Sequence, residues 1–199
     1  MLEGMTQSSP TVSIIMPCYN GAEYIEEAVA SVLAQNFKDW ELLIVNDGSS
    51  DASAKLIDDF AATDARITAI HNPTPSGPAK ARNVALKQAA GRYITFLDSD
   101  DAWYANKLTR QLEAFERTGA AVVFANYRTM DARSKRLGRV VCLHTFICRK
   151  TLFRGNPIGM LTGMYDTHKT GGVQLIPENV ICGEDWAMWF NLLNGQGRK

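Results

Sequence analysis

Five apolar runs rich in β-forming residues alternate with segments of helical periodicity along the first two thirds of this chain. The runs lie at residues 12–16, 42–45, 67–70, 93–97 and 121–124. Between the first two runs, apolar residues recur on one helix face at Ile25, Ala28, Val29, Val32 and Leu33. Because a strand, a helix and a parallel strand are connected by a right-handed crossover, this alternation predicts an α/β fold with a mostly parallel sheet and helices on both faces. With 199 residues, 46% of them hydrophobic, the chain can form one domain of ordinary size.

The fourth apolar run leads directly into carboxylates. Residues 93–97 are followed by Asp98, Asp100 and Asp101. Carboxylates crowded at the end of a buried strand repel one another and are costly to desolvate unless a cation lies among them. Their oxygen atoms suit Mg²⁺ or Mn²⁺, which complete their coordination with water and substrate phosphates. The alternative is that these residues cap the next helix, where Asp is favoured without any ligand.

Turn and cap residues mark the ends of the predicted strands. Asn20 followed by Glu23 resembles a capping box, and residues 46–51 combine the Gly, Ser and Asp of a tight turn with a helix cap. Pro78 fits the first position of a helix that is expected to extend to Ala90. The next predicted helix covers residues 106–118.

Beyond about residue 127 the alternation is lost. A basic stretch contains Arg128, Arg133, Lys135, Arg136 and Arg139. We interpret it as a solvated hairpin or loop, and only secondarily as a surface for an anionic acceptor. Residues 160–165 and 173–176 are expected to form two strands of a smaller mixed or antiparallel region. Gly183, Glu184 and Asp185 then precede an apolar helix at residues 186–193.

Charge and cysteine content exclude several classes of protein. Lys and Arg together number 21, as do Asp and Glu, so no net charge attracts nucleic acid or an anionic membrane. The four cysteines (Cys18, Cys142, Cys148 and Cys182) lie far apart, which indicates reduced thiols in a cytoplasmic protein. No apolar run reaches the roughly 18 residues of a membrane-spanning helix, and the N-terminus lacks the pattern of a signal peptide.

The absence of several sequence motifs argues against further classes of enzyme. The first strand-to-helix turn, residues 17–21, reads Pro-Cys-Tyr-Asn-Gly and lacks the G-x-G-x-x-G of dinucleotide-binding enzymes. The chain has neither the P-loop motif G-x-x-x-x-G-K-[ST] nor the nucleophile motif G-x-S-x-G. His71, His144 and His168 are scattered, with no spacing typical of a metal site or a catalytic triad.

The positive signal is a set of charged residues at the ends of separate segments. Asp47 follows the second run, residues 98–101 follow the fourth, Arg82 lies on the helix after the third, and Asp185 begins the late helix. Because the carboxyl ends of parallel strands meet at one edge of a sheet, the first two sets are expected to face one ligand, a nucleotide diphosphate held partly through a metal. Three simpler interpretations stay open. They are turn and cap chemistry for Asp47 and Ser50, a surface position for Arg82, and a first-turn carboxylate for Asp185.

In this order the motifs resemble glycosyltransferase family 2, the large inverting family with the GT-A fold that includes cellulose, chitin and hyaluronan synthases. The resemblance covers nearly the whole chain. The segments that carry it are residues 12–20, 41–51, 77–83, 91–101 and 183–186. One departure is Asn46, which stands where many relatives carry a second Asp.

For the nucleoside, the resemblance implies a pocket shaped by Pro17, Tyr19 and Glu23. Asp47 would accept a hydrogen bond from the base, most often uracil, and Arg82 would flank the base or its diphosphate.

For the reacting end of the donor, the resemblance implies that Asp98 contacts the ribose, with Ser99 beside it in the nucleotide-sugar site. Asp100 would coordinate the Mn²⁺ or Mg²⁺ that bridges both phosphates, and Asp101 would assist through water. Asp185 matches the catalytic base.

The activity implied is transfer of a sugar from a nucleotide diphosphate sugar, most often a UDP-sugar, to a hydroxyl group of a saccharide or lipid-linked acceptor with inversion. The setting would be bacterial cell-surface polysaccharide synthesis in the cytoplasm, with peripheral association at the inner face of the membrane. Residues 1–126 would bind the donor, and residues 127–199 would form the acceptor side of the same domain. Relatives continue past the acidic helix to a segment that closes over the diphosphate, so this side is expected to be incomplete.

Two rivals stay open. The first is a nucleotide-sugar-binding module that is weak or inactive in catalysis because it lacks this closing segment. The second is a nucleotidyltransferase that makes sugar nucleotides. It would need a Gly-rich loop with a basic residue after the first strand, which residues 19–22 do not supply.

Overall fold

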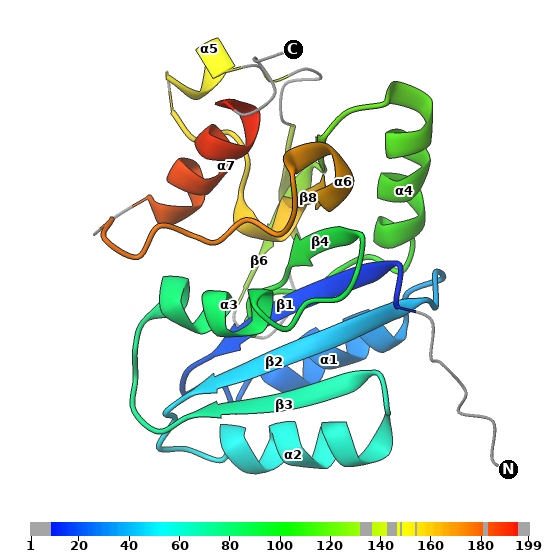
Figure 1. The fold of residues 1–199 in the computed structure, drawn as a ribbon. Coiled ribbons are helices and arrows are strands. Elements are labelled where there is room, and N and C mark those ends of the chain that lie inside the picture. The colour runs from blue at the N-terminus through cyan, green and yellow to red at the C-terminus, as the bar shows by residue number, and fades with distance from the viewer. Residues whose placement is uncertain are drawn as a thin grey trace, which may run out of the picture.

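The computed structural model describes residues 9–131, 137–142, 147, 149–153, 155–180 and 183–194. Within these residues the main sheet has the strand order β3-β2-β1-β4-β8-β5 (Figure 1). Its strands are β1 (Val12–Cys18), β2 (Trp40–Asp47), β3 (Ile67–Asn72), β4 (Tyr93–Phe96), β5 (Val122–Phe124) and β8 (Gly163–Asp166). Strands β1 to β4 are parallel, whereas β8 is antiparallel to both neighbours, β4 and β5. The predicted α/β fold with a mostly parallel sheet is therefore confirmed.

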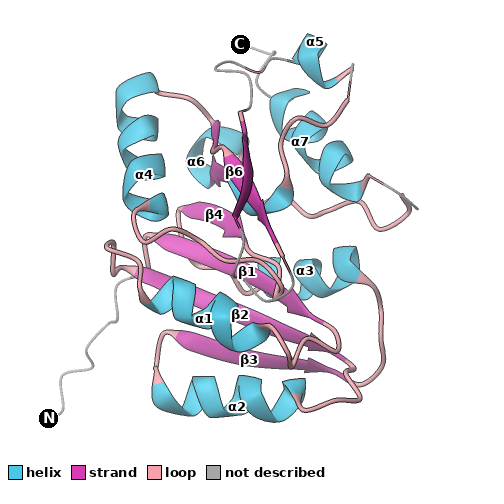
Figure 2. Cartoon of the chain, turned by 180° about the vertical axis from the view of Figure 1, so that it is seen from behind, coloured by secondary structure: helices cyan, strands magenta, loops and turns pink. Residues whose placement is uncertain are grey.

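Helices cover both faces of this sheet. The longer ones are α1 (Ile25–Leu33), α2 (Ser53–Thr63), α3 (Pro78–Leu86), α4 (Lys107–Thr118) and α7 (Glu184–Asn194). Figure 1 shows α3 in front of the sheet, and Figure 2, seen from behind, shows α1 on the opposite face. Short helical segments lie at α5 (Arg149–Leu152), at α6 (Thr167–Thr170) and at the 3₁₀ turn Met160–Thr162.

Two hydrophobic clusters, one on each face, explain why the strands are apolar along their whole length. On β1, Ile14 and Met16 belong to the cluster that includes residues of α1, α2 and α4, whereas Ile15 belongs to the cluster with α3 and α7. All three side chains are fully buried. A parallel strand covered on both faces requires this continuous run instead of an alternating pattern.

Three local predictions are wrong. Residues 160–165 contain the expected strand, β8, and it is antiparallel to its neighbours, but it inserts between β4 and β5 of the main sheet instead of forming part of a separate region. Residues 173–176 form no strand. Asn20 is not a helix cap: α1 begins at Ile25, and Asn20 has a positive φ of 50° in the loop before it.

The basic stretch contains a two-stranded antiparallel sheet, β6 (Tyr127–Met130) with β7 (Leu137–Val141), which confirms the expected hairpin. Arg133, Lys135 and Arg136 lie outside the described residues.

The observations on thiols and on membrane spans concern the described residues only. Cys18 is buried and Cys142 is exposed, and neither is in a disulfide; Cys148 and Cys182 lie outside the described part of the chain. Among the helices that are described, none has both the length and the apolar character needed to cross a membrane.

Candidate active site

A cavity of about 410 Å³ opens where the carboxyl ends of the parallel strands meet. The ends of β1 and β2, the loops after β1, β3 and β4 and the start of α3 form its walls. Seven residues predicted to bind the donor or the metal line it: Pro17, Tyr19, Asp47, Arg82, Asp98, Ser99 and Asp100. Glu23 is exposed and is not among the lining residues. It lies beside Tyr24, whose pKa its negative charge raises.

Asp47, the last residue of β2, is held by the loop that leads from β3 to α3. Its Oδ1 accepts hydrogen bonds from Asn72 Nδ2 (2.7 Å) and Ser76 Oγ (2.7 Å), and its Oδ2 accepts from the backbone N–H groups of Ser76 (2.9 Å) and Gly77 (2.8 Å). Burial alone would raise the pKa of this carboxyl, but the hydrogen bonds lower it overall. Asp47 is therefore a buried, ionised acceptor at the cavity wall.

Gly48 explains how the loop after β2 approaches this closely. Its φ is +69°, and a Cβ at this position would lie 2.7 Å from the backbone nitrogen of Pro75. Only glycine combines this conformation with the close backbone contact. The turn chemistry predicted for residues 46–51 thus places Asp47 against the loop of residues 72–77.

The same turn also fixes the loop after β1. The backbone N–H of Ser50 donates to Asn20 Oδ1 (2.8 Å), and that of Ala22 donates to Asp51 Oδ2 (3.1 Å). These bonds hold the segment that carries Tyr19, whose side chain is 56% exposed at the cavity. Ser50 therefore has the ordinary turn role, whereas Asp47 lines the cavity.

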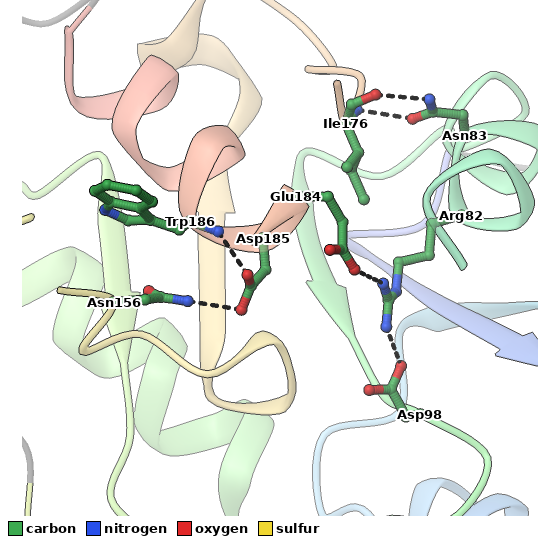
Figure 3. A network of polar contacts seen from close by, with 8 residues as sticks. All are labelled: Arg82, Asn83, Asp98, Asn156, Ile176, Glu184, Asp185 and Trp186. Carbon is green, nitrogen blue, oxygen red and sulfur yellow. Dashed lines mark hydrogen bonds and ion pairs between the residues drawn. The ribbon is translucent and has the colours of Figure 1, made fainter. Parts of the chain in front are cut away.

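Arg82 is not a surface residue. Only 6% of it is exposed, and its Nη2 lies 2.5 Å from Asp98 Oδ1. Its Nη1 lies 3.5 Å from Glu184 Oε1, in the first turn of α7 (Figure 3). The buried Nε has no hydrogen-bond partner among the described residues. The guanidinium thus joins the acidic segment after β4 to the start of α7.

The acidic segment itself turns tightly after β4, with the backbone N–H of Asp101 donating to Asp98 O (3.1 Å). Burial, followed by the charges of Asp98 and Asp100, raises the pKa of Asp101 to about 6. Burial and two neighbouring negative charges therefore both oppose ionisation of Asp101.

The residues present fit a metal that binds together with its substrate. No three His, Cys, Asp or Glu side chains of the described chain are grouped closely enough to hold a metal ion by themselves. Mg²⁺ sites built from one or two carboxylates and substrate phosphates need no such group. Asp100, at the cavity wall, supplies a carboxylate of this kind.

Asp185 lies near the cavity but does not line it. Its Oδ2 accepts a hydrogen bond from Asn156 Nδ2 (2.6 Å), and its Oδ1 accepts from the backbone N–H of Trp186 (2.7 Å). Figure 3 shows Asp185 and Glu184 side by side at the start of α7, with Glu184 directed towards Arg82. The ion pairs through Arg82 connect this helix to the cavity.

Two residues of the site received no individual role from the sequence. Asn83 and Glu184 stand inside the motifs at residues 77–83 and 183–186, but no pattern indicated that their side chains bind other parts of the chain. Asn83 is 2% exposed and bonds to the backbone of Ile176, and Glu184 bonds to Arg82. Both contacts span about a hundred residues of sequence, so spacing along the chain carries no signal for them.

A second cavity, of about 420 Å³, adjoins the first at Asp100. Tyr24 and Asp101 line it together with residues of β6, including Tyr127 and Arg128. The region beyond residue 127 therefore reaches the same acidic turn that borders the first cavity.

The fold and the cavity together identify the class of protein to which this chain belongs. The structure of S. aureus TarS 1-349 in complex with UDP superposes with a TM-score of 0.77 at 25% identity, over 93% of this chain and 55% of that one. TarS has the GT-A fold, and so does the chain described here. Residues 13–168 match the family model described as "Glycosyl transferase family 2", and the chain belongs to that family.

Two curated relatives agree with this assignment. The putative teichuronic acid biosynthesis glycosyltransferase TuaG of Bacillus subtilis (strain 168) is 38% identical over 189 residues, 95% of this chain and 74% of the relative. The UDP-Glc:alpha-D-GlcNAc-diphosphoundecaprenol beta-1,3-glucosyltransferase WfgD of Escherichia coli is 36% identical over 182 residues, 92% of this chain and 69% of the relative. The chain thus spans about seven tenths of these relatives and just over half of the solved TarS chain.

Proposed function

We propose that this protein transfers a sugar from a UDP-sugar to a hydroxyl group of a saccharide or lipid-linked acceptor, with inversion, in the synthesis of a bacterial cell-surface polysaccharide. The observation that carries the proposal is the convergence of Tyr19, Asp47, Arg82, Asp98 and Asp100 on one cavity, although they come from four separate segments. The names of the relatives support it. TarS is described in complex with UDP and with UDP-GlcNAc, and WfgD is named for a UDP-Glc donor and a diphosphoundecaprenol acceptor.

Different residues of the cavity would contact different parts of the donor. Tyr19 and Pro17 would flank the base, whose N–H would donate to Asp47. Asp98 and Ser99 would contact the ribose. Arg82 would offer its charge to the diphosphate, because a guanidinium binds phosphate oxygens well.

The reaction requires neutralisation of the departing diphosphate. A divalent metal bound at Asp100 would supply this as a Lewis acid. Asp185 would take the proton of the acceptor hydroxyl group as its oxygen attacks the anomeric carbon from the face opposite the diphosphate. The new carbon–oxygen bond forms while the bond to the phosphate oxygen breaks, and UDP leaves with that electron pair. One displacement without an enzyme nucleophile inverts the anomeric centre.

The acceptor would occupy the second cavity, which shares Asp100 with the first. Arg128 and Tyr127 on β6 offer a cation and an aromatic ring for a saccharide or an anionic linkage. A lipid-linked acceptor would place the protein at the inner face of the cell membrane.

The test is product analysis with a panel of UDP-sugars, Mn²⁺ and lipid-linked or free saccharide acceptors. The expected product from an α-linked donor is a β-linked saccharide, identified by the anomeric proton coupling in NMR. Asp185→Asn is expected to reduce the turnover number by at least about a hundredfold, within the range for loss of a general base. Asp59→Asn, at an exposed i,i+4 ion pair with Lys55, serves as the control and should leave turnover unchanged. Tight UDP binding without turnover on any acceptor would instead identify a nucleotide-sugar-binding module.

A further inference from the structure

Two consecutive residues of α3, Arg82 and Asn83, bond to two residues that lie close together late in the chain. Asn83 binds Ile176, and Arg82 binds Glu184 (Figure 3). Asp185, the proposed base, immediately follows Glu184. Helix α3, which lines the donor cavity, is therefore bonded directly to the first turn of α7.

The contact at Ile176 consists of two hydrogen bonds. Asn83 Nδ2 donates to Ile176 O (2.8 Å), and the N–H of Ile176 donates to Asn83 Oδ1 (2.8 Å). This pairing satisfies both the N–H and the C=O group of Ile176. Both residues are 2% exposed. Ile176 is thus bonded to α3 through both of its backbone groups.

The contact at Glu184 is looser and is shared with the donor cavity. Arg82 makes a 2.5 Å bond to Asp98 but only a 3.5 Å contact with Glu184. Its Nε, buried, has no partner within the described chain. An unsatisfied buried N–H is costly, so this guanidinium has donor capacity that a shift of one carboxylate would fill.

We propose that Glu184 is a positioning residue, which through Arg82 couples occupation of the donor cavity to the position of the first turn of α7 and hence of Asp185. When a donor engages Asp98, the Nη2 of Arg82 is released from its short bond. The guanidinium, still beside the diphosphate, then pairs more fully with Glu184 through Nη1, and the turn that carries Asp185 moves towards the cavity. This inference rests on the proposed function, since it assigns Asp98 to the donor and Asp185 to the reaction.

The geometry of Asp185 explains why such a movement is needed. Its carboxylate is occupied by Asn156 and by the N–H of Trp186, and it does not line the donor cavity. A base acts only within hydrogen-bond reach of the proton it takes, and such contacts often tighten only when the substrate is bound. A ligand shifts a conformational equilibrium only through contacts that differ between the two states. The Arg82–Glu184 pair is such a contact.

The experiment measures hydrogen exchange in α7 with and without UDP and Mn²⁺, together with the turnover number and the KM for the donor. In the wild-type protein, UDP with Mn²⁺ is expected to slow exchange of the first-turn amides of α7 at least about fivefold. Glu184→Gln is expected to bind UDP within about threefold of wild type, to lose this slowing, and to reduce the turnover number about tenfold with little change in KM. Glu184→Asp, which keeps the charge, should recover part of both effects.

The matched control is Asp64→Asn, which removes a carboxylate of similar exposure from another ion pair with an arginine. The side chain of Asp64 is 21% exposed and that of Glu184 is 23% exposed. Asp64→Asn should keep the full UDP response of α7 and the wild-type turnover number. Thermal unfolding of each variant shows that it is folded at the assay temperature.

The outcomes separate this inference from the proposed function. If Asp185→Asn is inactive while Glu184→Gln keeps the wild-type turnover number or the UDP response of α7, the coupling is wrong and the proposed function stands. If the wild-type protein transfers no sugar, the proposed function fails, and the exchange response to UDP still decides whether the coupling exists. If the wild-type protein does not bind UDP, both are wrong.

Discussion

Ser76 donates two hydrogen bonds to Asp47, one from its backbone N–H (2.9 Å) and one from its hydroxyl group (2.7 Å). With the bonds from Asn72 and Gly77, the carboxylate accepts four donors. An ionised carboxylate offers about four acceptor positions, so this one is fully occupied. A nucleobase that donates to Asp47 must therefore displace one of these donors, and a side-chain hydroxyl group can rotate away where a backbone N–H cannot.

The first prediction follows from this competition. Ser76→Ala removes a hydrogen-bond donor that the nucleobase would have to displace from Asp47. UDP affinity is therefore expected to rise by a few-fold, in line with about 1 kcal/mol for a net hydrogen bond. Isothermal titration calorimetry with UDP and Mn²⁺ measures the change. Thr63→Ala, which removes an exposed hydroxyl group outside this cavity, is the control and should leave affinity unaltered. A tenfold loss of affinity in Ser76→Ala would show that the Ser76 hydroxyl itself contacts the nucleotide.

The second prediction concerns Tyr19, which is 56% exposed at the cavity. An aromatic ring that stacks on a base contributes about 1–3 kcal/mol. Tyr19→Ala is therefore expected to weaken UDP binding about tenfold or more, whereas Tyr19→Phe keeps the ring and should remain within about twofold. Tyr104→Ala is the matched control, because Tyr104 is 61% exposed and lies outside this cavity. Equal losses in Tyr19→Ala and Tyr104→Ala would count against stacking at Tyr19.

The third prediction concerns stability and pH at the far end of β8. Asp166 is 1% exposed and accepts two hydrogen bonds from Arg92, at 3.1 Å and 2.7 Å, and one from the N–H of His168. Burial alone would raise the pKa of Asp166, but these bonds lower it below its usual value. In the unfolded chain the pKa returns to about 3.9, so the stabilisation is complete above about pH 5 and is lost as the pH falls through the lowered value.

Asp166→Asn is accordingly expected to lower the free energy of unfolding by about 2–3 kcal/mol at pH 7, below the usual range for a buried pair because Arg92 is half exposed. The difference from wild type should narrow as the pH is lowered from 5 towards 3.5. Urea denaturation at several pH values gives both quantities, with Asp59→Asn as an exposed comparison. A difference that is constant across this range would contradict the assignment of the effect to the ionised carboxylate.

The parallel half of the fold could be predicted because its signals are local. Residues 12–16, 42–45 and 93–97 are apolar throughout since both sheet faces are covered, and each polar tip that follows contains turn residues. The order of strands along the chain then fixes which edge carries Asp47 and Asp100. The convergence of these residues on one cavity was therefore expected from the sequence and is what the structure contains.

The remaining features depend on contacts between distant residues. β8 was expected in a separate region because nothing in residues 160–165 indicates the gap between β4 and β5 that it fills. Residues 173–176 have the composition of a strand, but side chains bind their backbone at two places instead of a partner strand: the N–H of Gln174 donates to the Tyr165 hydroxyl group, and Asn83 binds Ile176. Glu23 follows Asn20 at the spacing of a capping box, yet Asn20 binds the turn after β2, and α1 begins later.

The most direct test of the proposed donor site is a measurement of UDP affinity in the presence of Mn²⁺ and in the presence of EDTA, for the wild-type protein and for Asp100→Ala. We predict that EDTA weakens wild-type binding at least about tenfold and that Asp100→Ala binds as weakly with Mn²⁺ as wild type does with EDTA, since a metal shared between one carboxylate and the diphosphate requires both. Asp59→Ala should behave as wild type in both conditions. Equal UDP affinity in Mn²⁺ and EDTA, unchanged by Asp100→Ala, would contradict a donor site built on this acidic turn.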